Sequence, residues 1–517
     1  MSKHYLGLKS AVIFLTVFIA SCDKSQNTLD TPENKVSQLE LLTESRRTKL
    51  VREIQGQMIL DPLAVKTEEQ GAIVRDLFEG LVIYDKKGDI IPGVAERWET
   101  QDNKTWRFFL REDAKWANGE SVTAQDFILS WQNLAGSKSP LKSYLAFLNL
   151  KNAVPVLEHK LSVEKLGVSA ENDRTLLIIL DKPTPYLPAM LAHISLLPQY
   201  LQNSEQKVIT NGAYSLTSYD EKHVRLSKNP FYWEKSKAGF SQVDYIRQSS
   251  TLGEISDLAI NHRFTNLPQN ENPKYLPKLC TYFYEFNLND PTFAKSAVRK
   301  AIGSLISVKN ITESEVPKGL ASTQFLPKKM QVEQESEWVP IFAEQLLAEN
   351  GINEQHPLKL VLSFDDEDLH QRVANRIQRQ LAQSDMLRVT AESFPWRQLQ
   401  ERHITGEFQL IRSGWCADFN DPMAFFSLFY SKSPDNKTGY YNADFDRLFE
   451  RALQTLLEKE RSEIFLKLQQ HVQQEHLVIP IFQYRTPIWV EATLMGIDGQ
   501  NASGVVYSKD LWRKVQD

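Results

Sequence analysis

Residues 411–422, IRSGWCADFNDP, place a thiol at Cys416 close to a carboxylate at Asp418, in a stretch rich in residues that favour turns. Three kinds of chemistry fit these groups. Cys416 could be a nucleophile with His370 or His403 as its base, provided that it is an unpaired thiolate. The thiolate could instead bind a metal ion, or the segment could form part of a wall that holds a ligand.

The N-terminus helps to decide between these uses. Lys3 and Lys9 precede an apolar run over residues 11–20. This run is too short to span a bilayer. This order of charged, apolar and small residues predicts a signal peptide over residues 1–21. The tetrapeptide IASC, which ends at Cys22, resembles a bacterial lipobox, so Cys22 is expected to become the lipid-bearing first residue. Asp23 resembles the enteric signal for the inner membrane, with the outer membrane as the alternative.

The cysteine count then favours a disulfide. The chain has three cysteines, and with Cys22 lipidated only Cys280 and Cys416 remain in an oxidising compartment. A bond between them would close a loop of more than a hundred residues, which the chain-entropy account values at about 5 kcal/mol. The sequence holds no HExxH, GxSxG, P-loop, GxGxxG or cysteine pair at zinc spacing. We therefore expect no enzyme activity, no cofactor and no metal site.

The elements that must position these residues are both strands and helices. The chain has 517 residues, 42% hydrophobic, enough for more than one lobe, and its scattered basic residues and net charge of −5 argue against nucleic acid. Residues 22–47 are polar and suit a tether. Strands are predicted at 105–112, 175–182 and 358–364, and helices at 341–350, 368–383, 443–460 and 462–475. This mixture predicts an α/β fold whose lobes interleave in sequence.

Several longer motifs resemble one family. Residues 76–99, 105–131, 210–216, 279–293 and 411–422 are similar, in order, to the oligopeptide-binding family, the periplasmic solute-binding proteins of peptide ABC importers, close to the oligopeptide and murein-tripeptide binders. The resemblance implies two lobes, a hinge and three domains, with the Cys280–Cys416 pair bonded as in relatives. Domain I would comprise 48–78, 199–279 and 487–517, domain II 79–198 and domain III 280–486.

The resemblance also implies how a peptide would be held in a cleft between the lobes. Asp418 matches the acid that receives the ligand's ammonium, a charge that is costly to bury without an opposite charge. Trp415, Cys416 and Ala417 would contact the peptide main chain, which adds as a strand. Trp396, Trp415 and Tyr484 would form aromatic pocket walls, although either tryptophan could belong to the core instead.

Cations for the other end of the ligand, and departures from the family, complete the candidates. Arg412, His370, His403 and Arg402 stand at or beside family positions that receive the carboxylate, with simple surface placement as the alternative for each; Glu285 ends the wall segment CTYFYE. Lys66 stands where oligopeptide binders carry a glutamate, and Leu141 replaces a pocket tyrosine. A lysine there could favour an acidic side chain, as in a murein peptide.

These interpretations together describe a monomeric periplasmic lipoprotein, anchored to a membrane through Cys22. It would bind short peptides and deliver them to an inner-membrane ABC permease made of separate chains. The alternatives are a murein-tripeptide binder, a haem binder, an exported hydrolase, or an orphan binding lipoprotein without its own permease.

Overall fold

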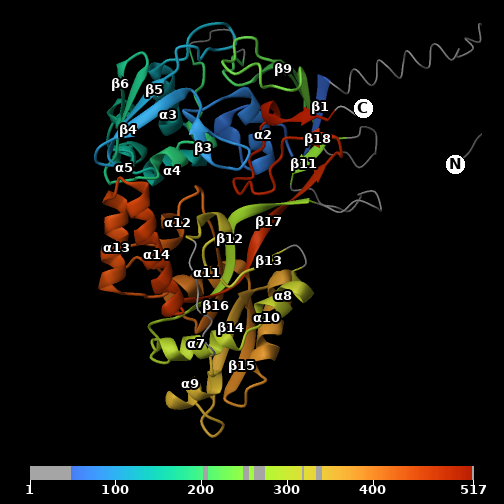
Figure 1. Cartoon of the computed structure of the whole chain (residues 1–517). Helices are drawn as coiled ribbons and strands as arrows, with labels where there is room; N and C mark the ends of the chain where they lie inside the picture. Colours follow the sequence, from blue (N-terminus) through green and yellow to red (C-terminus); the bar gives the residue numbers. More distant parts are fainter. Residues whose placement is uncertain are drawn as a thin grey trace, which may run out of the picture. The chain divides into compact units, whose positions relative to one another are not determined.

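The computed structural model describes residues 48–201, 208–247, 256–260, 274–316, 319–332 and 341–514 (Figure 1). The predicted signal peptide, lipidation site Cys22 and tether lie outside the described residues. Strands and helices alternate through the described part, which confirms the α/β class. Among the described residues, none of the helices has the length and apolar character needed to cross a membrane.

The largest sheet has eleven strands in the order β15-β14-β16-β12-β17-β11-β1-β10-β9-β8, with β13 paired to β17. Its members are β1 (Lys49–Ile54), β8 (Tyr214–Tyr219), β9 (His223–Lys228), β10 (Gln242–Arg247), β11 (Leu258–Ile260), β12 (Lys274–Phe286), β13 (Leu320–Ala321), β14 (Leu358–Asp365), β15 (Leu387–Phe394), β16 (Leu410–Cys416) and β17 (Val478–Val490). The sheet therefore joins strands from both ends of the chain to strands from its middle.

The two longest strands, β12 and β17, pair along most of their length but change register twice, between Pro277 and Thr281 and between Tyr282 and Phe283. Residues 278–280 of β12 lie opposite Tyr484 alone, because Pro277 pairs with Arg485 and Thr281 pairs with Gln483. Such bulges bend a strand locally. The predicted boundaries between domains I and III fall at this bulge on β12 and close to it on β17; the three-domain division itself stays a prediction.

A second sheet, in the order β4-β5-β7-β6, contains two of the predicted strands. Its strands are β4 (Ala95–Thr100), β5 (Thr105–Leu110), β6 (Val168–Asn172) and β7 (Thr175–Ile179). In β5, Trp106, Phe108 and Leu110 are buried and alternate with partly exposed residues, as expected for a strand with one covered face. Helix α3 (Ala124–Gly136) packs beside this sheet and begins with a capping box of Thr123 and Asp126. A short hairpin of β2 (Val82–Tyr84) and β3 (Ile90–Pro92) precedes the sheet.

The predicted helices form, with one wrong boundary. Helix α9 (Ala343–Glu349) ends just before Gly351, whose φ is +83°, and α10 (Asp368–Leu381) buries Val373, Ile377 and Leu381 on one face. The helix predicted over 443–460 instead breaks into α13 (Ala443–Gln454) and the start of α14 (Glu458–Gln474). Thr455 is extended at the break, and its carbonyl accepts a hydrogen bond from Asn103 at 3.3 Å. A tertiary contact therefore overrides the local preference for helix.

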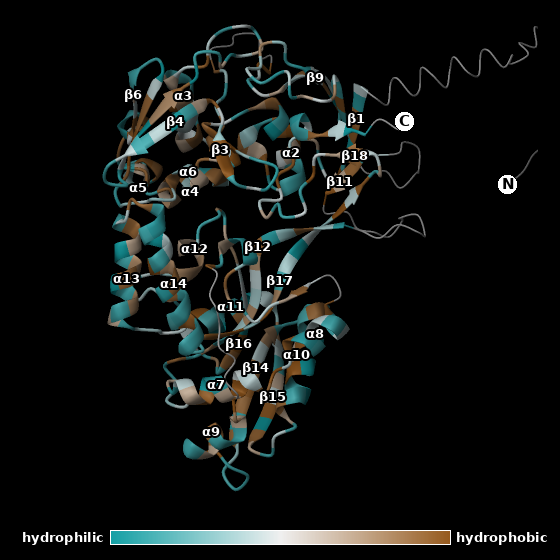
Figure 2. Ribbon diagram, in the orientation of Figure 1, coloured by the Kyte–Doolittle hydropathy of each residue, from teal (hydrophilic) through white to brown (hydrophobic). Residues whose placement is uncertain are grey.

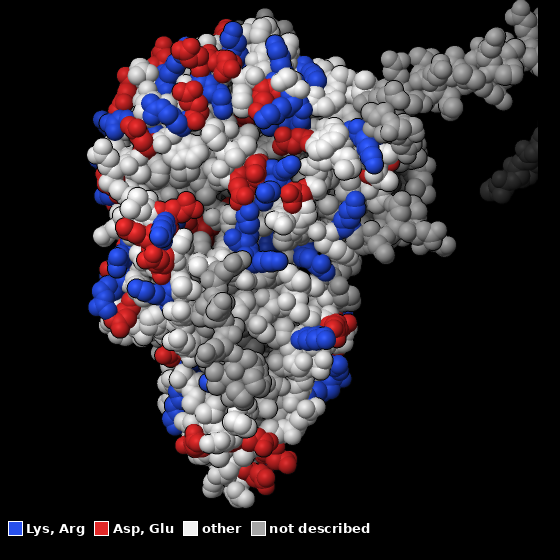
Figure 3. Space-filling model, in the orientation of Figure 1, with Lys and Arg blue, Asp and Glu red and all other residues white. Residues whose placement is uncertain are grey.

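The remaining α-helices are α2 (Glu68–Leu77), α4 (Ser143–Phe147), α5 (Ala153–Leu157), α6 (Leu187–Met190), α7 (Ser296–Ser304), α8 (Val308–Glu315), α11 (Trp396–Thr405) and α12 (Met423–Phe426). Of these, only α2 contributes residues to the cavity described below. Hydrophilic and hydrophobic stretches both occur along the helices (Figure 2). One core lies mainly in residues 50–258 and 494–511, the second and third lie mainly among residues 279–482, and a small fourth comprises Leu399, Phe408 and Ile411. On the face drawn in Figure 3, acidic and basic side chains are interspersed.

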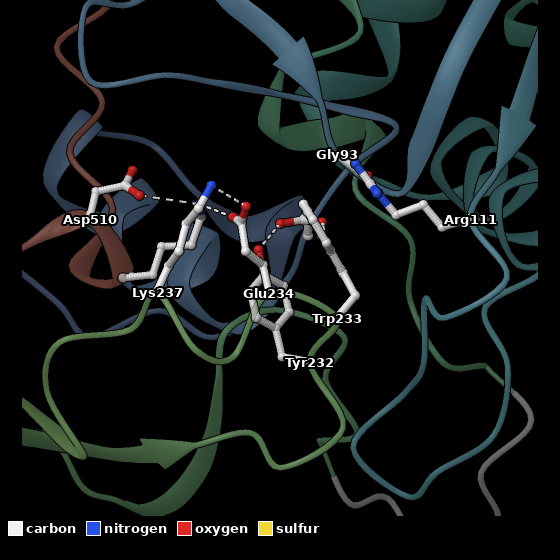
Figure 4. Close-up of polar contacts among 9 residues, drawn as sticks. Gly93, Arg111, Tyr232, Trp233, Glu234, Lys237 and Asp510 are labelled. Atoms are coloured by element: carbon white, nitrogen blue, oxygen red, sulfur yellow. Dashed lines mark hydrogen bonds and ion pairs between the residues drawn. The ribbon is translucent and has the colours of Figure 1, made fainter.

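A buried polar cluster fixes the C-terminal segment against the first core (Figure 4). Glu79, only 5% exposed, accepts hydrogen bonds from the Tyr232 hydroxyl and from Trp233 Nε1, and burial raises its pKa. Lys509 Nζ lies 3.2 Å from a carboxylate oxygen of Glu234. These contacts link residue 79 to residues 232 and 233, and residue 234 to residue 509 of the C-terminal segment.

Candidate ligand-binding site

A disulfide joins Cys280 of β12 to Cys416 of β16, as predicted. The two cysteines are directly opposite each other in the antiparallel ladder, and the Ala417 N–H donates to the Leu279 carbonyl at 2.9 Å just beyond it. The bond leaves no thiolate on Cys416, so the nucleophile interpretation is wrong. The segment that follows is anchored on its other side by Phe419, which is buried and stacks on Tyr186 with ring centroids 4.7 Å apart.

Asp418 lies between these two anchors with its carboxylate unengaged. It has no hydrogen bond or ion pair with any other described residue, and its side chain is reached by solvent. Surrounding protein nevertheless removes enough water to raise the pKa of Asp418, and burial is the only cause of this shift. A carboxylate held in this way is ready to receive a cation from a ligand.

The carboxylate lines a cavity of about 330 Å³ that segments far apart in sequence enclose. The lining residues are Val65, Lys66, Thr67, Glu68, Gly71, Ala72, Arg75, Tyr84, Leu141, His193, Ile194, Ile260, Ala417, Asp418, Ser503, Gly504, Val505 and Val506. Of the predicted ligand residues, the structure thus brings Lys66, Ala417 and Asp418 together, and Leu141 joins them.

The start of helix α2 positions Lys66 at the rim. Thr67 is the N-cap residue and accepts from the Gln70 N–H, while the Gln70 side chain accepts from the Lys66 N–H at 2.8 Å. This reciprocal pattern fixes the direction in which the chain enters the helix. The Lys66 ammonium has no carboxylate partner among the described residues, whereas Glu68 pairs with Lys278 at 3.3 Å.

Arg75 and His193 line the same cavity and were missed by the sequence analysis. Arg75, in the last turn of α2, donates from Nη1 to the Ala192 carbonyl at 3.0 Å and has no ion pair among the described residues. Burial and the nearby Arg75 lower the pKa of His193 to about 3, so its imidazole is neutral at physiological pH. Neither residue belongs to a motif, and only the fold brings them beside Asp418.

Arg412 and His370 form a separate buried network. Arg412 Nη2 lies 2.8 Å from His370 Nε2, and Arg412 Nη1 lies 3.4 Å from Asp365 Oδ1. His370 Nδ1 lies 2.6 Å from Asp365 Oδ2, which assigns the ring proton to Nδ1. Burial and Arg412 lower the pKa of His370, so it is a neutral link between Arg412 and Asp365 and supplies no second cation.

The same network contains the one group of metal-ligand type found among the described residues. Donor atoms of Asp365, Glu367 and His370 lie within 4.8 Å of one another. The guanidinium of Arg412 already contacts both Asp365 and His370. Because the Arg412 guanidinium already pairs with the negative charge that would attract a metal ion, and would repel that ion, these three residues do not suit a metal site.

Of the three aromatic residues predicted as pocket walls, Tyr484 and Trp396 lie beside Arg412, and Trp415 lies near the end of β16. The Tyr484 hydroxyl accepts from Arg412 Nη2 at 3.5 Å, and the Trp396 ring centroid lies 5.7 Å from the Arg412 guanidinium. Trp396 is 53% exposed, so it does not belong to the core. Trp415 is partly buried against the third core and also lines a second cavity of about 140 Å³ with Cys416 and Asp418.

Glu285 and His403 contact each other. Glu285 is 3% exposed, and its Oε2 lies 2.5 Å from His403 Nε2. The neighbouring Arg402 places its guanidinium over the Phe394 ring, 4.6 Å from the centroid. None of the three lines the cavity of Asp418.

Comparisons with known proteins agree with this architecture. A family model described as "Bacterial extracellular solute-binding proteins, family 5 Middle" matches residues 89–437. A Haemophilus influenzae binding protein is 53% identical over 98% of both chains, and the periplasmic oligopeptide-binding protein OppA of Salmonella typhimurium is 31% identical over 88% of this chain and 90% of its own. The solved structure of the murein tripeptide-binding protein MppA in its unliganded open form superposes with a TM-score of 0.83 at 28% identity, over 90% of this chain and 97% of its own. The chain therefore belongs to the family 5 bacterial extracellular solute-binding proteins.

Proposed function

We propose that this protein binds short peptides, without catalysis, and that Asp418 receives the N-terminal ammonium of the ligand. The observation that carries the proposal is the unpaired Asp418 carboxylate, which lines a cavity of about 330 Å³ beside the Cys280–Cys416 bond. An ammonium placed there would gain a charge partner, and the carboxylate would lose the disadvantage of its partial burial.

The free edge of β16 supports a grip on the peptide main chain. Strand β14 pairs with β16 only at Leu410 and Ile411, so residues 412–416 have no strand on that side within the described sheet. Backbone groups on such an edge can hydrogen-bond to an added strand of any sequence. Trp415, Cys416 and Ala417 would then contact the ligand's backbone, with Trp396 and Tyr484 as aromatic walls near Arg412.

The relatives suggest the physiological setting. OppA is a periplasmic oligopeptide-binding protein and MppA a periplasmic murein peptide-binding protein by their names. We place this chain in the periplasm as a monomer anchored through a lipid on Cys22, with a cleft between domains I–II and domain III. It would deliver peptides to an ABC permease of separate chains.

The proposal is tested by native purification followed by mass spectrometry of the carried ligands, and by calorimetry with Ala-Ala-Ala. Peptides in the native sample and a measurable affinity for the tripeptide are expected. A haem absorption band, or amino acids released from the tripeptide, would point to a different ligand or to catalysis and would overturn the proposal.

Asp418→Asn is expected to stabilise the ligand-free protein near neutral pH. Because the folded pKa of Asp418 is raised, the folded state binds more protons than the unfolded state between the two pKa values, and the wild type loses stability as pH rises through that window. The neutral amide avoids this loss. When melting temperatures are measured from pH 3 to pH 8, that of the Asp418→Asn protein should therefore rise increasingly above that of the wild type as the pH rises.

The matched control for this measurement is Asp113→Asn, which changes an exposed acid outside the cavity. Its melting curve should follow that of the wild type. An Asp418→Asn protein that melts at or below the wild-type temperature at pH 8 would contradict the assigned burial of the carboxylate.

A further inference from the structure

The cavity of Asp418 contains more positive than negative unpaired charge. Lys66, Arg75 and Asp418 line it without an ion pair among the described residues, while Glu68, the other charged lining residue, is paired with Lys278. His193 is neutral, so it adds no charge. Among the described residues, the unpaired charged groups of the lining are therefore two cations and one anion.

The cations and the anion do not neutralise each other. No ion pair joins Asp418 to Lys66 or Arg75, and neither cation lowers the pKa of Asp418. Arg75 and Asp418 both act on the pKa of Tyr84. Burial is the main cause that raises this pKa to about 12; the negative charge of Asp418 also raises it, and the positive charge of Arg75 lowers it. Arg75 and Asp418 are thus both close enough to affect one buried tyrosine, but they do not contact each other.

Arg75 is also fixed in direction. Its Nη1 donates to the Ala192 carbonyl, and its guanidinium lies 5.9 Å from the Tyr84 ring centroid. An arginine bound to a carbonyl at one nitrogen keeps other N–H groups to offer, and a carboxylate is the partner that such donors match best. Lys66, just before the helix, adds a second donor to the lining of the same cavity.

We propose that Arg75 and Lys66 are specificity residues that select peptides carrying a carboxylate close to the N-terminal ammonium bound by Asp418. This inference rests on the proposed function. A neutral first residue would leave the partly buried Arg75 and the exposed Lys66 at the rim without a charge partner, whereas a carboxylate would pair with them through charge-assisted hydrogen bonds. The carboxylate could be an acidic side chain or the C-terminus of a dipeptide.

The test is calorimetry on the full mature protein with two matched ligand pairs. Glu-Ala-Ala against Gln-Ala-Ala reports an acidic side chain, and Ala-Ala against Ala-Ala-amide reports a terminal carboxylate. We expect at least one pair to differ tenfold or more in dissociation constant, in favour of the carboxylate. The pair that differs identifies the source of the carboxylate.

Substitutions assign that difference to the two cations. Arg75→Gln and Lys66→Gln should each reduce the ratio, and the double variant should bring it within threefold of unity. Arg75→Lys, which keeps the charge, should retain part of it, and Lys182→Gln, an exposed lysine outside the cavity, should leave the ratio unchanged. The ratio of the two dissociation constants is measured on one protein sample, so it does not change if a substitution lowers the fraction of folded protein.

Two outcomes would overturn the proposal and are distinguishable. If Gln-Ala-Ala and Glu-Ala-Ala bind equally, Ala-Ala and its amide bind equally, and binding still depends on Asp418, peptide binding stands and the selectivity fails. If none of the four ligands binds, the proposed function fails as well. A ratio that survives in the double variant would transfer the selectivity to other residues.

Discussion

Asp418→Ala is expected to weaken peptide binding by two to three orders of magnitude or more. The substitution would leave the ligand's ammonium enclosed in the cavity without an opposite charge, and loss of one partner of a buried pair costs about 3–5 kcal/mol. The carboxylate makes no other hydrogen bond or ion pair among the described residues, so the loss would not be masked by collapse of a network. Calorimetry with Ala-Ala-Ala would measure it.

An N-acetylated tripeptide supplies the matched control, because it removes the charge from the ligand instead of from the protein. It should bind the wild type as weakly as the free tripeptide binds the variant. Combining both changes should add little, since the two modifications remove the same interaction. Additive losses, or an acetylated peptide that binds normally, would assign Asp418 a different role.

Replacing both cysteines, as Cys280→Ser with Cys416→Ser, is expected to lower the free energy of unfolding by about 3–5 kcal/mol. The bond joins residues 136 apart in sequence, so its loss frees a long loop in the unfolded chain. Cys280 is buried and Cys416 is exposed, so the serine at position 280 would also leave a hydroxyl group in a buried environment. Guanidinium titration of the ligand-free protein would measure the change in midpoint.

The reduced wild-type protein provides the comparison for this variant. Reducing agent should shift the wild-type midpoint toward that of the double-serine protein and leave the variant itself unmoved. If reduction and substitution both leave the midpoint unchanged, the crosslink adds nothing to stability. Peptide affinity should fall in parallel, because the bond holds the segment that carries Asp418.

The features that could be predicted from the sequence are those that depend on a local residue pattern or on the number of cysteines. The aromatic and apolar density of residues 105–112 predicted the strand β5, and the four-residue spacing of Leu369, Val373, Ile377 and Leu381 predicted the helix α10; both form. The Cys280–Cys416 bond followed from the number of cysteines that remained after Cys22. Both inferences use information contained within a short segment or within the composition.

The remaining features depend on contacts between distant segments. The break at Thr455 is held by Asn103, more than three hundred residues away, so helix propensity alone extended the helix too far. Arg75 and His193 face Asp418 only because residues 65–84, 193 and 417–418 enclose one cavity. His370 was expected to be a cation, but its desolvation and its position beside Arg412 keep it neutral.

The bulge in β12 at residues 278–280 lies at the base of the segment that carries Asp418. Cys280 lies within the bulge and is covalently joined to the strand end that precedes Asp418, whereas Lys66 and Arg75 belong to the segment around α2. Any change of bend at this point will therefore carry the carboxylate along while leaving the two cations behind. If β12 bends there when a ligand binds, the distance between the opposite charges would change, and the same side chains would fit carboxylates at different distances from the ammonium.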